Sequence, residues 1–171
     1  MSPEPWQLTL ETASVEETEE VGEIMGRRLK GGEVIALEGS LGAGKTALIR
    51  GLARGLGIKD HEISSPTFVF LHEHHGRLPL AHLDLFRIGS PSDLPDLGIQ
   101  DYLESPWVVA VEWAERAPWY LPEDRLTIRM SETQNQHHRR LVLHTSNPCY
   151  EAVFSELKVA FCAFTSNRRE R

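Results

Sequence analysis

The chain has 171 residues, a formal net charge of −7 and an isoelectric point near 5.6. Its length favours one domain over residues 1–171, with a core at about 6–146 and a C-terminal helix and basic tail at 147–171. The acidic charge argues against broad nucleic-acid binding by the chain alone. No apolar stretch approaches the roughly 20 residues of a membrane span, and the N-terminal residues lack a signal-peptide pattern, so we expect a cytoplasmic protein without a membrane partner.

The first expected elements are a strand and a helix. Residues 6–10 alternate apolar and polar side chains, as an edge strand does. Ser14 and Glu17 form a capping box, and apolar residues then recur at helical spacing as far as Leu29. The Lys-Gly-Gly sequence at 30–32 predicts the end of this helix.

A glycine-rich segment at residues 39–46 follows. It reads Gly-Ser-Leu-Gly-Ala-Gly-Lys-Thr and fits the phosphate-binding loop (P-loop) pattern G-x-x-x-x-G-K-[ST]. Residues 34–37 before it are apolar and predict a short buried strand, and residues 45–56 after it have leucine and isoleucine at helical spacing. Strand, glycine loop and helix in this order predict that backbone N–H groups and the helix dipole hold the phosphates of a nucleotide.

Two side chains of the P-loop have particular roles in this prediction. Lys45 places a positive charge on the outer phosphates, and the Thr46 hydroxyl can ligate Mg²⁺. The residues of this segment that we expect at the nucleotide are Gly39, Ser40, Leu41, Gly42, Ala43, Gly44, Lys45, Thr46 and Ala47.

The rest of the chain alternates strands and helices. Strands are expected at 67–71, 80–86, 107–111, 125–130 and 140–144. Short helices are expected at 91–103 and a C-terminal helix at 150–161. The alternation predicts an α/β, P-loop NTPase-like fold, a mixed and mostly parallel sheet flanked by helices, in which the last two strands extend the sheet in the antiparallel sense.

Two acidic residues are candidates for the magnesium carboxylate that such a site needs. Glu112 ends the apolar strand, and Asp84 lies in a strand where it shares one face with His82. Because buried charges are paired or bind metal, both acids could converge on one ion; the alternative for Asp84 is a structural pair with Arg87.

Further polar residues allow weaker predictions. Ser65 and Thr67 enter a strand and offer hydroxyls to a phosphate or a water. His72, His74 and His75 could suggest a metal site, but a solvated loop is favoured because no second ligand cluster has zinc-like spacing. The chain has no Asn-Lys-x-Asp segment for reading guanine, which favours adenine.

Four segments stand out together: the P-loop, Ser-Pro-Thr-Phe at 65–68, His-Leu-Asp-Leu-Phe-Arg at 82–87, and Glu-Trp at 112–113. In this order and spacing they resemble the TsaE family, the bacterial P-loop ATPases needed to make threonylcarbamoyladenosine in tRNA. The resemblance runs from about residue 18 to about residue 140. The chain departs from the family at Phe86, where tyrosine is usual.

The resemblance implies ATP and Mg²⁺ as cofactors and a complex with the TsaB and TsaD proteins, with tRNA met only indirectly. It assigns Mg²⁺ binding to Thr46 and Glu112 and a supporting role in catalysis to Asp84. Together with the reasoning on the two acids, this gives Lys45, Asp84 and Glu112 as candidate catalytic residues and Thr46, Glu112 and Asp84 as candidate metal ligands. It also implies that Thr18, on the first helix, approaches the nucleotide.

A late basic residue should approach the nucleotide as well. His137, Arg139 and Arg140 compete for this place, and we assign it to Arg140.

Two other functions share the same phosphate loop. One is a small-molecule kinase, which would transfer phosphate to an acceptor rather than to water. The other is a nucleotide-gated binding module, in which hydrolysis is incidental.

Overall fold

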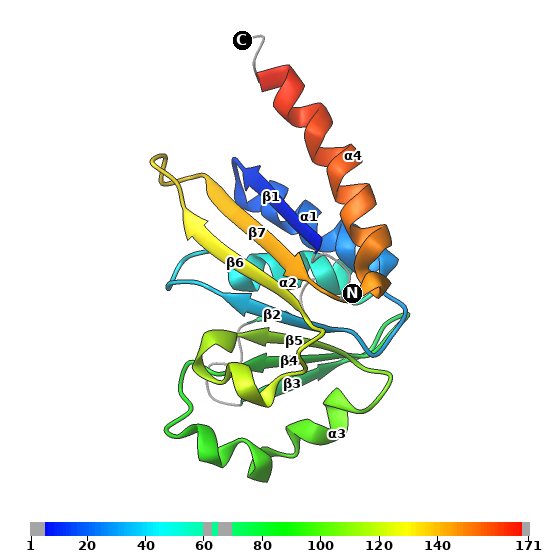
Figure 1. Ribbon diagram of the computed structural model, residues 1–171, viewed down its shortest axis with the longest axis vertical. Helices are drawn as coiled ribbons and strands as arrows, with labels where there is room; N and C mark the ends of the chain where they lie inside the picture. Colours follow the sequence, from blue (N-terminus) through cyan, green and yellow to red (C-terminus); the bar gives the residue numbers. More distant parts are fainter. Residues whose placement is uncertain (1–5, 60–62, 65–69, 169–171) are drawn as a thin grey trace.

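The computed structural model describes residues 6–59, 63, 64 and 70–168, and a seven-stranded sheet forms its centre (Figure 1). The strands lie in the order β1-β7-β6-β2-β5-β4-β3. Their bounds are β1 Trp6–Thr12, β2 Val34–Glu38, β3 Leu71–His74, β4 Leu80–Asp84, β5 Val108–Glu112, β6 Leu126–Glu132 and β7 Arg139–Thr145. The helices are α1 Val15–Arg28, α2 Lys45–Gly55, α3 Ile99–Leu103 and α4 Glu151–Arg168.

The sheet is mixed, and most of its strands run in one direction. Strand β2 pairs in parallel with β5 and β6, and β5 pairs in parallel with β4. Strands β3 and β7 run antiparallel to their neighbours, and β1 is antiparallel to β7. The predicted fold class is confirmed. The expected direction of the last two strands is wrong for β6, which joins β2 in parallel, and right for β7.

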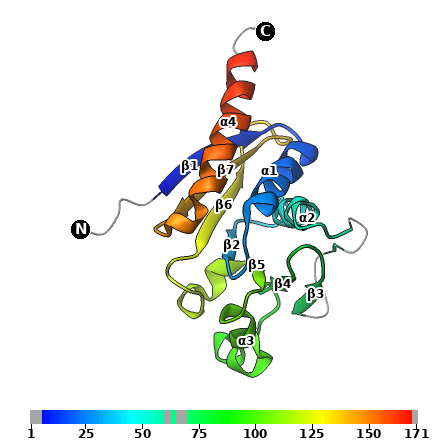
Figure 2. The ribbon, with the colours of Figure 1, turned by 90° about the vertical axis from the view of Figure 1, so that its right-hand side faces the viewer.

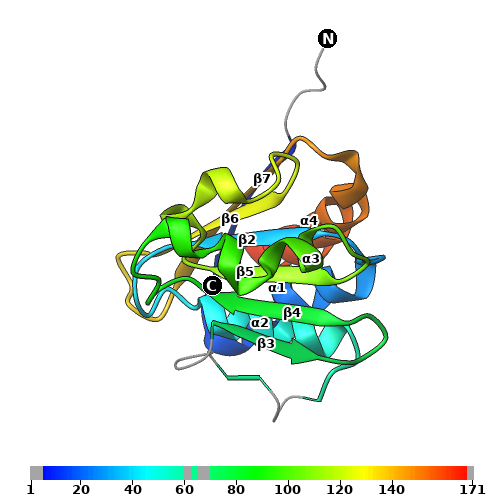
Figure 3. The ribbon, with the colours of Figure 1, turned by 90° about the horizontal axis from the view of Figure 1, so that it is seen from below.

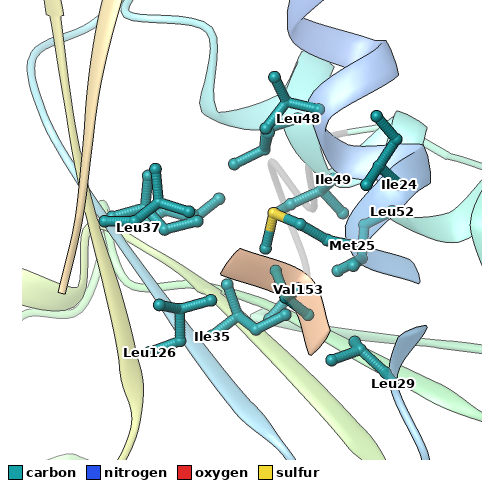
Figure 4. Packing of buried hydrophobic residues seen from close by; sticks show 14 of the residues in the cluster. Ile24, Met25, Leu29, Ile35, Leu37, Leu48, Ile49, Leu52, Leu126 and Val153 are labelled. Atoms are coloured by element: carbon teal, nitrogen blue, oxygen red, sulfur yellow. The ribbon is translucent and has the colours of Figure 1, made fainter. Parts of the chain in front are cut away.

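Apolar residues cover both faces of the sheet. On one face α1, α2 and α4 bury a large cluster that includes Ile35 and Leu37 of β2 (Figure 4). On the other face Val34 and Ala36 of β2 join a second cluster with Ile99 of α3. Figure 2 shows α3 apart from the α1–α2 pair, and Figure 3 shows β5, β4 and β3 side by side. A strand with buried side chains on both faces is a continuous apolar run, as residues 34–37 are.

Helices α1 and α2 pack in close contact because glycines line their interface. A Cβ atom added to Gly51 would lie 1.8 Å from the Glu19 carbonyl oxygen, and one added to Gly22 would lie 2.1 Å from the Leu48 carbonyl oxygen. Arg50 and Glu19 pair across the same interface at 2.7 Å. This packing brings the first turn of α1 beside the P-loop that precedes α2.

The structure corrects the expectation for the histidine-rich segment. We expected a solvated loop, but His72 and His74 lie in β3, which pairs antiparallel with β4. His74 is buried, with 7% of its surface exposed. In the described part of the chain no three His, Cys, Asp or Glu side chains gather as a metal site would require. Residues 67–69 of the strand expected at 67–71 lie outside the described residues, and β3 begins at Leu71.

The C-terminal helix is longer than expected. It runs from Glu151 to Arg168 rather than over 150–161, and its end projects away from the sheet (Figure 1). None of the helices in the described ranges has the length and apolar character that crossing a membrane demands.

Candidate nucleotide-binding site

The P-loop connects β2 to α2 at the C-terminal edge of the parallel strands. Gly39, Gly42 and Gly44 all have positive φ, at 143°, 79° and 99°. A Cβ atom on Gly39 would also lie 2.3 Å from the Met130 carbonyl oxygen, so both backbone angle and space require glycine there. Gly44 is the N-terminal cap of α2. The sequence order strand, loop and helix is therefore present, with the helix N-terminus at the loop.

Lys45 is folded back on its own loop. Its ammonium Nζ donates hydrogen bonds to the carbonyl oxygens of Gly39 at 2.6 Å and Ser40 at 2.9 Å. The same nitrogen lies 3.8 Å from the centre of the Trp113 ring. Burial lowers the pKa of Lys45, and nearby carboxylates, Glu112 foremost, act in the opposite direction. The positive charge of Lys45 thus lies between two carbonyl oxygens and the Trp113 ring, close to where phosphates would lie.

Thr46 and Glu112 form the best candidate pair for a magnesium ion. The Thr46 hydroxyl lies 3.0 and 3.1 Å from the two carboxylate oxygens of Glu112. Glu112 is buried, with 3% of its surface exposed. Cis ligands of an octahedral Mg²⁺, at bond lengths of about 2.0–2.1 Å, lie about 2.9 Å apart. The spacing and the oxygen donors therefore fit this ion.

Asp84 lies beside Glu112, on the neighbouring strand. The two residues are register partners in the parallel β4–β5 pair. Asp84 is 9% exposed, and its Oδ1 accepts a hydrogen bond from the backbone N–H of Phe86 at 2.9 Å. Leu83 packs on the opposite face of β4, as the alternation of the sequence predicts. The two acids therefore meet at one edge of the sheet, where the P-loop also lies.

A pocket of about 410 Å³ opens next to the P-loop, between the start of α1 and the start of β7. Thr18 lines it, and its methyl group would lie 3.7 Å from a Cβ on Gly44. The Thr18 hydroxyl donates a hydrogen bond to the Ser14 carbonyl oxygen at 3.1 Å and shares a second hydrogen bond with the Thr12 hydroxyl at 2.8 Å. The other lining residues are Ala13, Ser14, Val15, Glu16, Gly42, Gly44, Ala47, Gln136, His137 and Arg139.

Arg139, rather than Arg140, reaches the P-loop. The Arg139 guanidinium donates a hydrogen bond to the Gly42 carbonyl oxygen at 3.1 Å. Arg140 lies on the other face of β7 and pairs with Glu11 of β1 at 2.8 Å. Our assignment of Arg140 to the nucleotide is therefore not supported by the geometry, because successive side chains of a strand point to opposite faces. Leu141 points into the α1–α2 core, and this pattern could have selected Arg139 from the sequence.

The remaining predicted residues divide into two groups. Ser65 and Thr67 lie outside the described residues. The other P-loop residues differ in exposure: Ser40 and Leu41 are exposed, with Leu41 at 80%, while Ala43 is buried and Ala47 borders the pocket.

Two residues near the site had no predicted role in it. Trp113 contacts the Lys45 ammonium with its ring, and its ring centre lies 4.8 Å from that of Phe86. It also has φ of 58°, a left-handed conformation that a tryptophan adopts at a cost. Glu115 accepts a hydrogen bond from the Gly39 N–H at 3.2 Å. No local sequence pattern marks either contact, because both depend on the turn after β5.

The comparisons with known proteins agree on one family. The model of the family described as "Threonylcarbamoyl adenosine biosynthesis protein TsaE" matches residues 12–141. The tRNA threonylcarbamoyladenosine biosynthesis protein TsaE of Treponema pallidum is 44% identical over 117 residues, 68% of this chain and 86% of that protein. The Bacillus subtilis protein of the same name is 37% identical over 152 residues, 88% of this chain and 94% of that protein.

A solved structure supports the same relation. The crystal structure of Bacillus subtilis YdiB superposes with a TM-score of 0.75 and 32% identity, covering 91% of this chain and 97% of that one. The matched residues 12–141 include the P-loop, Asp84, Glu112 and Arg139. The chain belongs to the TsaE family of threonylcarbamoyl adenosine biosynthesis proteins.

Proposed function

We propose that this chain binds ATP with Mg²⁺ and hydrolyses it, as the ATPase subunit of the machinery that makes threonylcarbamoyladenosine in tRNA. One observation carries the proposal: the Thr46–Glu112 pair lies at the P-loop, with Asp84 beside it. A P-loop supplies backbone donors for phosphates, and the neighbouring oxygen ligands supply a place for the ion that accompanies them. A role in tRNA modification is consistent with a cytoplasmic location.

The proposed roles of the side chains follow from their positions. Thr46 and Glu112 would hold Mg²⁺, which when bound neutralises the charge that develops on the phosphates. Lys45 would turn from the loop carbonyls toward the outer phosphates. Asp84 would orient the attacking water, directly or through water on the ion. Catalysis by such groups consists of positioning and electrostatic stabilisation.

The pocket beside the P-loop would take the rest of the nucleotide. Its walls mix apolar groups, such as the Ala47 methyl, with the Arg139 guanidinium. A guanidinium at this position can bond phosphate oxygens or stack on a base. We therefore assign to Arg139 the nucleotide contact that the sequence alone had given to Arg140.

Replacing Arg139 with alanine should weaken ADP binding about tenfold, equivalent to about 1.4 kcal/mol, because one charge-assisted contact is lost. Arg140→Ala should leave the dissociation constant unchanged, since Arg140 faces Glu11 on the opposite side of β7. Calorimetric titration of both variants with ADP measures the difference. If Arg140→Ala weakened ADP binding more than Arg139→Ala did, Arg140 would be the residue that contacts the nucleotide.

We propose TsaB and TsaD as the proteins with which this subunit acts. The acidic net charge of −7 suits a protein that meets tRNA through partners. Phe86, 45% exposed, packs with a tilted ring against Trp113, which in turn contacts Lys45. A partner that covers Phe86 would therefore act on Lys45 through the contact between the Phe86 and Trp113 rings.

ATP turnover tests this proposal. The chain alone should release phosphate slowly, and adding TsaB and TsaD at fixed Mg²⁺ and salt should raise the rate at least about tenfold, because P-loop enzymes often need a partner to complete their site. Labelled γ-phosphate should appear as inorganic phosphate. Transfer of the phosphate to a small-molecule acceptor would instead support a kinase. Fast ATP turnover that TsaB and TsaD do not change would contradict the proposal that this chain acts as their ATPase subunit.

A further inference from the structure

His82 is a buried histidine to which the proposed function gives no task. It lies in the middle of β4 with none of its surface exposed. Its neighbours along the strand, Ala81 and Leu83, point to the opposite face and pack in the second apolar cluster. His82 therefore shares its face of the sheet with Asp84, toward α2 and the candidate magnesium ligands.

Among the described residues, the imidazole of His82 makes one hydrogen bond, and it goes to Glu112. Nε2 lies 2.8 Å from Oε1 of the carboxylate. A carboxylate offers only acceptors, so Nε2 must carry the hydrogen and donate it. The other ring nitrogen, Nδ1, has no hydrogen-bond partner in the described part of the chain.

Packing alone does not account for a histidine at this position. A leucine would fill similar space in the sheet without burying a polar atom that lacks a partner. The unpartnered Nδ1 lowers the stability of the fold. What histidine supplies, and leucine would not, is the hydrogen bond from Nε2 to Glu112. That bond restrains a carboxylate that also accepts from the Thr46 hydroxyl, at 3.0 and 3.1 Å.

The two restraints on Glu112 differ in what a cation would do to them. Thr46 and Glu112 would both turn their oxygens to the ion, so the hydrogen bond between them would be exchanged for two metal bonds. The His82 bond comes from the neighbouring strand and is compatible with coordination. We propose that His82 is a positioning residue that fixes the Glu112 carboxylate for the divalent cation of the nucleotide complex.

This inference rests on the proposed function, and manganese binding tests the two separately. Mn²⁺ replaces Mg²⁺ as a spectroscopic probe, and electron paramagnetic resonance measures its binding to the protein–ADP complex. His82→Leu removes the donor. His82→Gln keeps an N–H donor the same number of bonds from Cβ. His74→Leu is the matched control, because His74 is also buried but lies at the far end of the β3–β4 pair, opposite Leu80.

His82→Leu should weaken Mn²⁺ binding about 10-fold or more, the usual effect of losing such a partner. His82→Gln should restore most of the affinity, and His74→Leu should match the wild type. ADP affinity measured in EDTA should stay unchanged in all three variants. His82→Met, which also lacks a donor, replaces the leucine variant if that variant does not fold.

Two results would overturn the inference while leaving the ATPase proposal intact. One is wild-type Mn²⁺ affinity in the donor-free variants. The other is an equal loss in His82→Gln and His82→Leu together with weaker ADP binding in EDTA, which would indicate a purely structural role. Failure of the wild-type protein to bind Mn²⁺ with ADP would overturn both proposals.

Discussion

Lys45→Ala should lower ATP hydrolysis about 10²–10³-fold, the range found when one donor to developing charge is removed from an active site. The ammonium lies 2.6 Å from the Gly39 carbonyl oxygen and is the buried cation of the P-loop. It needs only a change of side-chain conformation to reach phosphates bound in the same loop. Alanine leaves the backbone donors in place but removes that charge.

Phosphate release at saturating ATP and Mg²⁺ measures the effect. Lys59→Ala is the matched control, since Lys59 is exposed beyond the C-terminal end of α2, and it should keep wild-type turnover. A circular dichroism spectrum like that of the wild type shows that the Lys45 variant is folded. Near-normal turnover by that folded variant would contradict the P-loop assignment.

The contacts of Lys45 also bear on the cost of nucleotide binding. Its ammonium bonds two loop carbonyls and lies on the Trp113 ring, and phosphates must compete with these partners. Trp113 itself is held at φ 58°, directly after Glu112. Trp113 therefore links Lys45, which its ring contacts, to Glu112, the proposed metal ligand that precedes it in the chain. A partner that shifts Phe86 would act on all three, since the Phe86 and Trp113 rings are in contact.

Much of the fold and the centre of the site could be predicted because their signals are local. The P-loop occupies eight consecutive residues, and its glycines have the positive φ values that the pattern demands. Glu112 ends a strand that is apolar on both faces, so its place at the edge of the sheet follows from the chain order. The shared face of His82 and Asp84 follows from strand alternation alone.

Other features depend on pairing that a local pattern does not contain. Strand β3 is short and reads Leu-His-Glu-His, a polar sequence that becomes a strand by pairing with β4. The direction of β6 is decided by its parallel pairing with β2, across more than 80 residues of sequence. The choice between Arg139 and Arg140 depended on which face of β7 meets α1, and the neighbouring leucines carried that information.

Glu112→Gln and Asp84→Asn should separate metal binding from turnover. Both changes keep the size of the side chain and remove one negative charge. The Glu112 carboxylate is bonded to Thr46 and His82, so its loss should raise the Mg²⁺ concentration for half-maximal hydrolysis about 10–100-fold. Asp84 contacts the Phe86 N–H and lies one strand further from Thr46. Its amide variant should lower the maximal rate about 10²-fold with little change in Mg²⁺ dependence.

Magnesium titrations of ATP turnover, carried to saturation for each variant, provide both quantities. The reason for the asymmetry is geometric. The Thr46 hydroxyl is hydrogen-bonded to both Glu112 oxygens at 3.0 and 3.1 Å, and oxygens so close can share one ion. Asp84 lies one strand further from Thr46, so we expect it to reach that ion through a bound water. Equal shifts in Mg²⁺ dependence would make both acids direct ligands. If only Asp84→Asn shifted the Mg²⁺ dependence, Asp84 would be the metal ligand and Glu112 would act on the rate. The hydrogen bond from His82 to Glu112 would then need a different explanation.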